Sequence, residues 1–140
     1  MAGYSGTPLA RKLGVRPGDS LALLGAPDGF AIDDLPPGVE VRHRARPASD
    51  VIVSFHTRHA ELARRFPILM RALVADGGLW VAWPKRASGV DTDITEDTVR
   101  EVALPTGMVD NKVCAIDDTW SGLRLVLRKE LRGGRTTAGG

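Results

Sequence analysis

The residues of this chain with the clearest chemical capacity are a histidine and two neighbouring aspartates. His56 directly follows the apolar run Asp50–Phe55, and an imidazole can act as an acid or a base near neutral pH. Asp117 and Asp118 lie in a later polar segment and offer carboxylates for acid–base work or for a metal ion. We expect His56 or Asp117 to move the proton if the chain catalyses a reaction. The alternatives are a histidine that caps a helix or packs on a sheet, and aspartates that form a turn.

A second group of residues is suited to binding an anion. Lys85 and Arg86 are adjacent cations, and the small residues after them leave backbone N–H groups free to donate. Trp83 and Trp120 can stack on a ligand or line a partner surface. The alternatives are a solvated loop for the two cations and core packing for the two tryptophans.

Strands and helices follow one another along the part of the chain that must position these residues. Short apolar runs bounded by turn residues predict buried strands, and spaced apolar positions predict helices. The predicted strands are Ser20–Leu24, Val39–Arg44, Asp50–Phe55, Leu79–Trp83, Met108–Ile116 and Leu123–Arg128. The predicted helices are Pro8–Leu13, Thr57–Ala75 with a break or bend at Pro67 and a stop at Asp76-Gly77-Gly78, and a helix from the cap Thr95 to about Ala103. This order predicts an α/β, three-layer Rossmann-like fold, with a mostly parallel sheet of about six strands that ends in an antiparallel hairpin.

The carboxyl ends of the predicted strands would form one rim, and ligands of open parallel sheets bind at that rim. The candidate catalytic residues His56 and Asp117 follow two of these strands. The residues that we expect to bind a ligand there are Gly25, Pro27, Trp83, Lys85, Arg86, Asp118 and Trp120. The two adjacent cations favour a small anionic ligand. Trp120, an aromatic residue in a polar segment, favours a protein partner as the alternative.

Several common sites are missing from the sequence. The histidines at positions 43, 56 and 59 have no cysteine partner and no H-x-x-x-H spacing, so we expect no metal site. The sequence has no G-x-x-x-x-G-K-[ST] phosphate loop and no G-x-S-x-G nucleophile elbow. We assign no cofactor.

Size and composition predict one domain over residues 1–132, with a disordered tail over 133–140. The net charge of the 140 residues is only +2, so we expect no nucleic-acid partner. Cys114 is the one cysteine, which excludes an internal disulfide and suits a reducing compartment. The first 13 residues lack the apolar core of a signal peptide, and no apolar run is long enough to span a membrane. These features predict a cytoplasmic protein with no membrane partner.

Four segments resemble the sheet of the class I methyltransferases. Val15-Arg16-Pro17-Gly18-Asp19 resembles the approach to the first strand, and Asp50–Phe55 resembles the strand that borders the acceptor site. Leu73–Val81 resembles a helix end with a glycine turn into the next strand. Gly107–Ile116 and Gly122–Arg128 resemble the terminal hairpin. The resemblance implies a truncated methyltransferase-like fold.

The same segments depart from that family where it holds S-adenosylmethionine. Pro27 stands where a loop glycine belongs, and proline removes an N–H and fixes φ. Leu23 stands where the family usually has an acidic residue, and His43-Arg44 ends the second strand where a carboxylate would hold the ribose. The segment between the first two strands is also too short for a full helix. We therefore do not expect S-adenosylmethionine-dependent methyl transfer, and we favour a chain that is not an enzyme.

Four further segments resemble a family of short actinobacterial proteins described only as a domain of unknown function. The segments are Ala2–Leu9, Trp80–Lys85, Val109–Cys114 and Asp118–Arg124. This resemblance implies a bacterial cytoplasmic setting and carries no activity.

Three functions fit these observations. The first is a lapsed or non-catalytic methyltransferase-like domain that binds a small anionic ligand or a protein partner at the rim. The second is a minimal transferase in which His56 or Asp117 moves a proton and Lys85 steadies negative charge. The third is an interaction module that forms a homodimer through an exposed strand edge.

Overall fold

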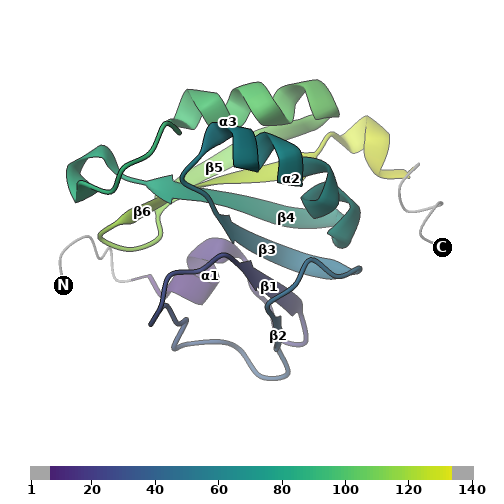
Figure 1. The fold of residues 1–140 in the computed structure, drawn as a ribbon. Helices are drawn as coiled ribbons and strands as arrows, with labels where there is room; N and C mark the ends of the chain where they lie inside the picture. Colours follow the sequence, from purple (N-terminus) through teal and green to yellow (C-terminus); the bar gives the residue numbers. More distant parts are fainter. Residues whose placement is uncertain (1–6, 134–140) are drawn as a thin grey trace.

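One sheet organises residues 7–133, which are the residues that the computed structural model describes. Its strands are β1 (Ser20–Leu24), β2 (Glu40–Arg42), β3 (Ser49–Phe55), β4 (Leu73–Pro84), β5 (Met108–Ala115) and β6 (Trp120–Leu127). The spatial order is β2-β1-β3-β4-β6-β5 (Figure 1). The first four strands are parallel, and β6 is antiparallel to both of its neighbours, so β5 runs in the direction of β4. The predicted Rossmann-like fold with a terminal antiparallel hairpin is confirmed.

The helices lie on both faces of this sheet. They are α1 (Leu9–Leu13), α2 (His59–Ala72) and α3 (Glu96–Ala103), with single 3₁₀ turns η1 (Arg86–Ser88) and η2 (Leu104–Thr106). Figure 1 shows α2 and α3 over one face and α1 on the opposite side. A last helical turn covers 129–133, and the rest of the predicted tail lies outside the described residues.

The face under α2 and α3 is packed by regularly spaced apolar side chains. Leu62, Phe66 and Leu69 of α2 and Val99 of α3 are at most 1% exposed and lie in one cluster with strand residues such as Ile52. The helix α2 runs through Pro67 without a break, so of the two predicted alternatives, a break or a bend, the break is wrong. The buried residues on either side of Pro67 keep this turn on the sheet, while Pro67 itself faces solvent.

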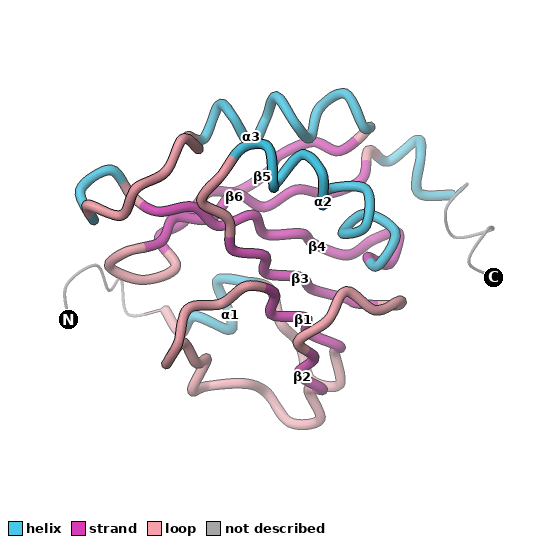
Figure 2. Tube along the Cα trace, in the orientation of Figure 1, coloured by secondary structure: helices cyan, strands magenta, loops and turns pink. Residues whose placement is uncertain are grey.

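The opposite face has little helix to cover it. Only the five-residue α1 lies there, and Trp80 of β4 fastens it to the sheet by donating from Nε1 to the carbonyl of Leu13 at 3.0 Å. Figure 2 shows the chain from β1 to β2 as one long loop with no helix. Apolar side chains of this loop complete the cover, among them Phe30, Ile32 and Leu35.

The glycines that we expected to stop α2 belong to a strand. Gly77 and Gly78 lie inside β4, which begins directly after α2 at Leu73. A Cβ on Gly77 would lie 2.7 Å from the carbonyl oxygen of Asp50, and one on Gly78 would lie 2.6 Å from Nε of Arg124. The two glycines are therefore needed for close approach of neighbouring chains, not for a turn.

The terminal hairpin is tighter than predicted. The strand β6 begins at Trp120, three residues before the expected start at Leu123, so the connection is only 116–119. The backbone N–H of Ile116 donates to the carbonyl of Trp120 at 2.8 Å and extends the pairing of the two strands. Trp120 thus enters the sheet, where its ring is covered, instead of standing in a polar turn.

Candidate functional site

The carboxyl edge of the sheet on the α1 face is filled by aromatic side chains. The ring of Phe55, at the end of β3, lies 5.0 Å from the ring of Phe30 and 5.1 Å from the ring of Trp120, both edge-on. Phe55 and Trp120 are 6% and 9% exposed. Gly25 follows β1 with φ of 69°, and a Cβ there would lie 3.0 Å from the carbonyl oxygen of Phe55. This part of the rim is therefore core.

The loop after β1 lacks the parts that would hold an adenosyl cofactor. Pro27 has no N–H to give, and its carbonyl accepts a hydrogen bond from the N–H of Phe30 at 3.0 Å, so the chain turns back at once. No helix follows within residues 25–39, so this loop places no helix N-terminus at the end of β1. The end of β2 presents Arg42, whose guanidinium pairs with Glu40 at 2.9 Å. The residues at this edge do not fit the cofactor.

His56 lies on the other face, in a chain of three side chains. Its Nδ1 is 2.5 Å from Oε1 of Glu61, and its Nε2 is 2.6 Å from Oγ of Ser54. A carboxylate only accepts, so Nδ1 carries the hydrogen of that bond, and Nε2 shares the other bond with the hydroxyl of Ser54. Ser54 and His56 are 2% and 4% exposed. The order of groups is that of a hydrolytic triad, but the hydroxyl of Ser54 is enclosed. The three hydrogen-bonded side chains join the end of β3 to the first turn of α2.

The acidic residues of the hairpin turn hold the turn together. Oδ1 of Asp117 accepts from the N–H groups of Thr119 and Trp120 at 2.9 Å and 2.8 Å. Asp118 is exposed beside it. The backbone N–H of Lys85 donates to the carbonyl of Thr119 at 2.7 Å, so the turn and the end of β4 lie against each other. His56 and Asp117 as catalytic groups stay a prediction.

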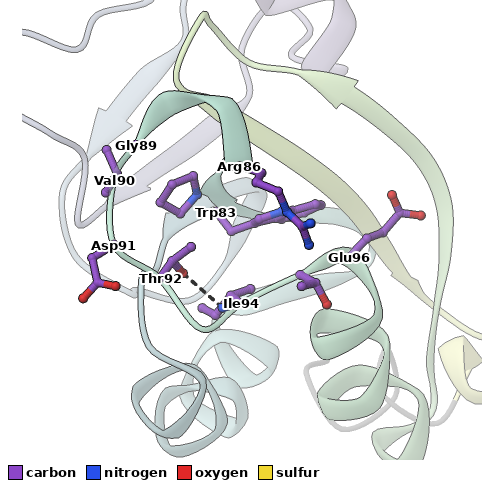
Figure 3. A pocket seen from close by; sticks show the side chains of 10 residues that line it. Trp83, Arg86, Gly89, Val90, Asp91, Thr92, Ile94 and Glu96 are labelled. Carbon is purple, nitrogen blue, oxygen red and sulfur yellow. Dashed lines mark hydrogen bonds between the residues drawn. The ribbon is translucent and has the colours of Figure 1, made fainter.

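A pocket of about 550 Å³ opens beyond β4, on the face that α2 and α3 cover. Its apolar side is formed by Trp83, Pro84 and Ile94, and the loop between β4 and α3 supplies the rest. Figure 3 shows the side chains of this loop arranged about the indole of Trp83. The further lining residues are Arg86, Gly89, Val90, Asp91, Thr92, Thr95 and Glu96. The volume is within the range of small-molecule sites.

The loop that forms this pocket is fixed to the start of α2. The hydroxyl of Thr92 donates to the carbonyl of Thr57 at 2.7 Å and accepts from the N–H of Ile94 at 3.1 Å, the bond drawn in Figure 3. Oδ1 of Asp93 accepts from the N–H of His59 at 2.7 Å and so caps α2. The helix α3 is capped by Thr95, as predicted, in a capping box with Thr98.

Of the charged side chains that line the pocket, one cation has no ion-pair partner. Asp91 pairs with Arg58 at 2.5 Å, and this hydrogen bond raises the pKa of the guanidinium. Glu96 pairs with Arg100, and that hydrogen bond raises the pKa of Arg100 in the same way. The guanidinium of Arg86 makes no hydrogen bond or ion pair within residues 7–133. Among the charged residues that line the pocket, Arg86 is therefore the one whose charge is unpaired.

The structure divides the predicted site residues into separate groups. Trp83 and Arg86 share the pocket, whereas Trp120 packs at the edge on the other face, and Gly25 and Pro27 are exposed in the loop after β1. Sequence reasoning missed Thr92 and Asp91, which form the pocket, and Glu61, the partner of His56. The signal for Glu61 was a carboxylate in the first turn of the helix that follows the histidine.

Three solved structures share this arrangement, and two of them are methyltransferases. A SAM-dependent methyltransferase from Aquifex aeolicus aligns over 84% of this chain and 86% of its own, at 13% identity and a TM-score of 0.62. The magnesium protoporphyrin IX methyltransferase of Synechocystis PCC 6803, with bound SAM, aligns over 85% and 74%, at 11% identity and a TM-score of 0.56. TrmN from Thermus thermophilus aligns over 85% and 47%, at 15% identity and a TM-score of 0.57. The chain has a methyltransferase-like fold.

The likeness to these proteins is one of fold. No family model matches the sequence, and no curated protein matches it. Within residues 7–133 the methyltransferase-like fold holds no group of three or more histidine, cysteine or acidic side chains placed to bind a metal ion. None of the helices in that range has the length and apolar content needed to cross a membrane.

The role of His56 can be tested by removing its ring. His56→Ala leaves the enclosed hydroxyl of Ser54 without its partner and opens a cavity, so we expect a loss of about 2–4 kcal/mol in unfolding free energy. His59→Ala, at an exposed position three residues on, is the matched control and should cost under about 0.5 kcal/mol. Urea denaturation measures both. Equal stability of the two variants would show that the hydrogen-bonded chain has no structural role.

Proposed function

We propose that the chain is a methyltransferase-like domain without the adenosyl cofactor, and that it binds a small anionic ligand in the pocket around Trp83. The carrying observation is the unpaired guanidinium of Arg86 in that pocket, whose two carboxylates, Asp91 and Glu96, are paired with arginines. Trp83, Pro84 and Ile94 supply an apolar wall. A flat ligand with one carboxylate suits this combination, because its body packs on the wall while its charge meets the guanidinium.

The filled edge on the α1 face supports the absence of the cofactor. The ring of Phe30 packs there on Phe55, the N–H of Pro27 is missing, and β1 is followed by loop. An adenosyl group would have to displace buried aromatic side chains before it reached the end of β1. A reaction that needs this cofactor is therefore not part of the proposed function.

The setting of the domain is proposed on the sequence alone. We infer that residues 1–132 form one domain of a cytoplasmic protein, and that it belongs to the actinobacterial family that its motifs resemble. Trp80–Lys85 and Asp118–Arg124, two of the segments that carry this resemblance, meet in the structure at the pairing of β4 with β6. Two segments that pair with each other in the sheet depend on each other's sequence, so we expect the members of such a family to keep both.

The anion pocket is tested by titration with 2-naphthoate, followed by backbone amide NMR, with neutral 2-naphthamide as the matched ligand. We expect saturable shifts in residues 85–95 with the carboxylate and weaker binding of the amide. Arg86→Gln should weaken binding of the carboxylate about tenfold, since it removes one charge-assisted contact. Arg64→Gln, on an exposed turn of α2, should leave it unchanged. Equal binding of the two ligands, or shifts outside the pocket, would contradict an anion site.

A second candidate function is homodimer formation through the edge of the sheet. The strand β5 pairs only with β6, so its other side offers free backbone groups, and Val113 at its centre is 52% exposed. Two copies of β5 could pair antiparallel and cover both valines.

Light scattering of the purified chain tests the dimer. We expect a mass twice that of the chain at micromolar concentration, and a monomer after Val113→Lys, which places a charge in the seam. Ile68→Lys is the control because Ile68 is also an exposed apolar residue but lies on α2. A monomeric wild-type chain would contradict this second function and leave the pocket proposal untouched.

A further inference from the structure

A small cleft with only cationic charge lies between α1 and the terminal hairpin, on the face opposite to the pocket around Trp83. Its volume is about 250 Å³. The lining residues are Arg11, Lys12, Gly14, Asn111, Lys112 and Arg124, of which four are cations and none is acidic. Residues far apart in the sequence thus bring like charges together, which costs free energy unless something offsets it.

Arg124 is the most unusual member of this group. It is half-buried in the middle of β6, and its guanidinium lies so close to β4 that a Cβ on Gly78 would touch it. Within residues 7–133 its side chain makes no hydrogen bond and no ion pair. Burial lowers the pKa of Arg124, and the charge of Arg132 lowers it further. A guanidinium held in place, partly desolvated and without a partner is prepared for an anion.

The carbonyl groups at the C-terminal end of α1 are hydrogen-bonded, so they do not exclude an anion from the cleft. The last carbonyls of a helix carry partial negative charge and would repel one. Here the carbonyls of Ala10 and Arg11 accept from the N–H groups of Val15 and Gly14, and that of Leu13 accepts from Trp80. The carbonyl of Lys12 accepts from Nζ of Lys112 at 3.1 Å, which leaves two donors on that ammonium. The cleft thus offers donors and no unpaired carbonyl among these four.

The charges of Lys12 and Lys112 act on the same side chain, that of Cys114. Burial raises the pKa of the half-buried Cys114 thiol, and the charges of Lys12 and Lys112 both oppose that rise. Both ammonium groups are therefore close to one point on β5. Several cations around one small volume favour a dianion over a monocarboxylate.

A second polar cleft continues from the first and shares Gly14 and Arg124 with it. Its volume is about 380 Å³, and its acidic residues are Asp19, Asp50 and Asp76. One oxygen of Asp19 and one of Asp50 accept backbone N–H groups at 2.8 Å, and the carboxylate of Asp76 is exposed. Carboxylates in such a cleft accept hydrogens from hydroxyl groups of a ligand.

We propose that these joined clefts bind a phosphorylated polyol, with its phosphate on Arg124 between α1 and β5 and its hydroxyl groups toward Asp76. The phosphate supplies the dianion that the cationic cleft lacks. The hydroxyl groups match the acidic cleft beside it. This site is separate from the pocket around Trp83, because the two lie on opposite faces of the sheet.

The test is an amide NMR titration at constant ionic strength with glycerol 3-phosphate, inorganic phosphate and glycerol as probes. We expect saturable shifts at Gly14, Asn111 and Lys112 with both phosphates, tighter binding of the ester, and no shift with glycerol. Arg124→Gln should weaken both phosphates at least about tenfold, because the central charge-assisted contact is gone. The double variant Arg11→Gln/Lys112→Gln, at exposed positions, should weaken them even if Arg124→Gln does not fold.

Two controls establish whether binding depends on the clefts themselves. Arg128→Gln removes an exposed cation outside the clefts and should change neither affinity. The response of residues 85–95 to 2-naphthoate should survive Arg124→Gln, so the two sites fail or succeed independently. Shifts that do not saturate, or affinities unchanged in both cleft variants, would overturn the proposal. Tighter binding of a single-stranded oligonucleotide than of glycerol 3-phosphate would also overturn it, in favour of a nucleic-acid surface.

Discussion

A parallel sheet must be covered on both faces, and this chain has a full helical cover for only one of them. The helices α2 and α3 cover one face, whereas the other has the five-residue α1 and a loop. Buried strands such as β1 and β3 cannot leave their apolar side chains in water, so aromatic residues of the loop and of the hairpin close the gap. Phe30, Phe55 and Trp120 are the result, and they lie at the carboxyl edge where ligands of this fold bind.

This constraint separates the two faces in their chemistry. On the α1 face the edge has become core, and the charged clefts lie further down, beside α1 and Arg124. On the helical face, the loop after β4 is fixed to the start of α2 by Thr92 and Asp93 and leaves an open pocket over Trp83. The fold is methyltransferase-like, and neither the pocket over Trp83 nor the charged clefts include residues at the end of β1.

The sequence predicted the elements because their signals are local. Six apolar runs and the cap Thr95 were sufficient for the fold class and the α3 start. The predictions that were wrong depended on contacts between residues distant in the sequence. Gly77 and Gly78 resemble a turn, yet they are strand residues beside Asp50 and Arg124. The site followed the same rule. Arg86 beside a tryptophan was visible, but the pairing of Asp91 and Glu96, which leaves the guanidinium of Arg86 as the unpaired charge of the pocket, depends on arginines elsewhere in the fold.

The central claim is that aromatic core has replaced the cofactor site at the end of β1. Calorimetric titration of S-adenosylhomocysteine and S-adenosylmethionine into the purified chain tests it most directly. The account predicts no saturable heat, in the wild type and in Trp83→Ala alike. Saturable binding that Gly25→Ala abolishes would place the cofactor at this edge and contradict the account.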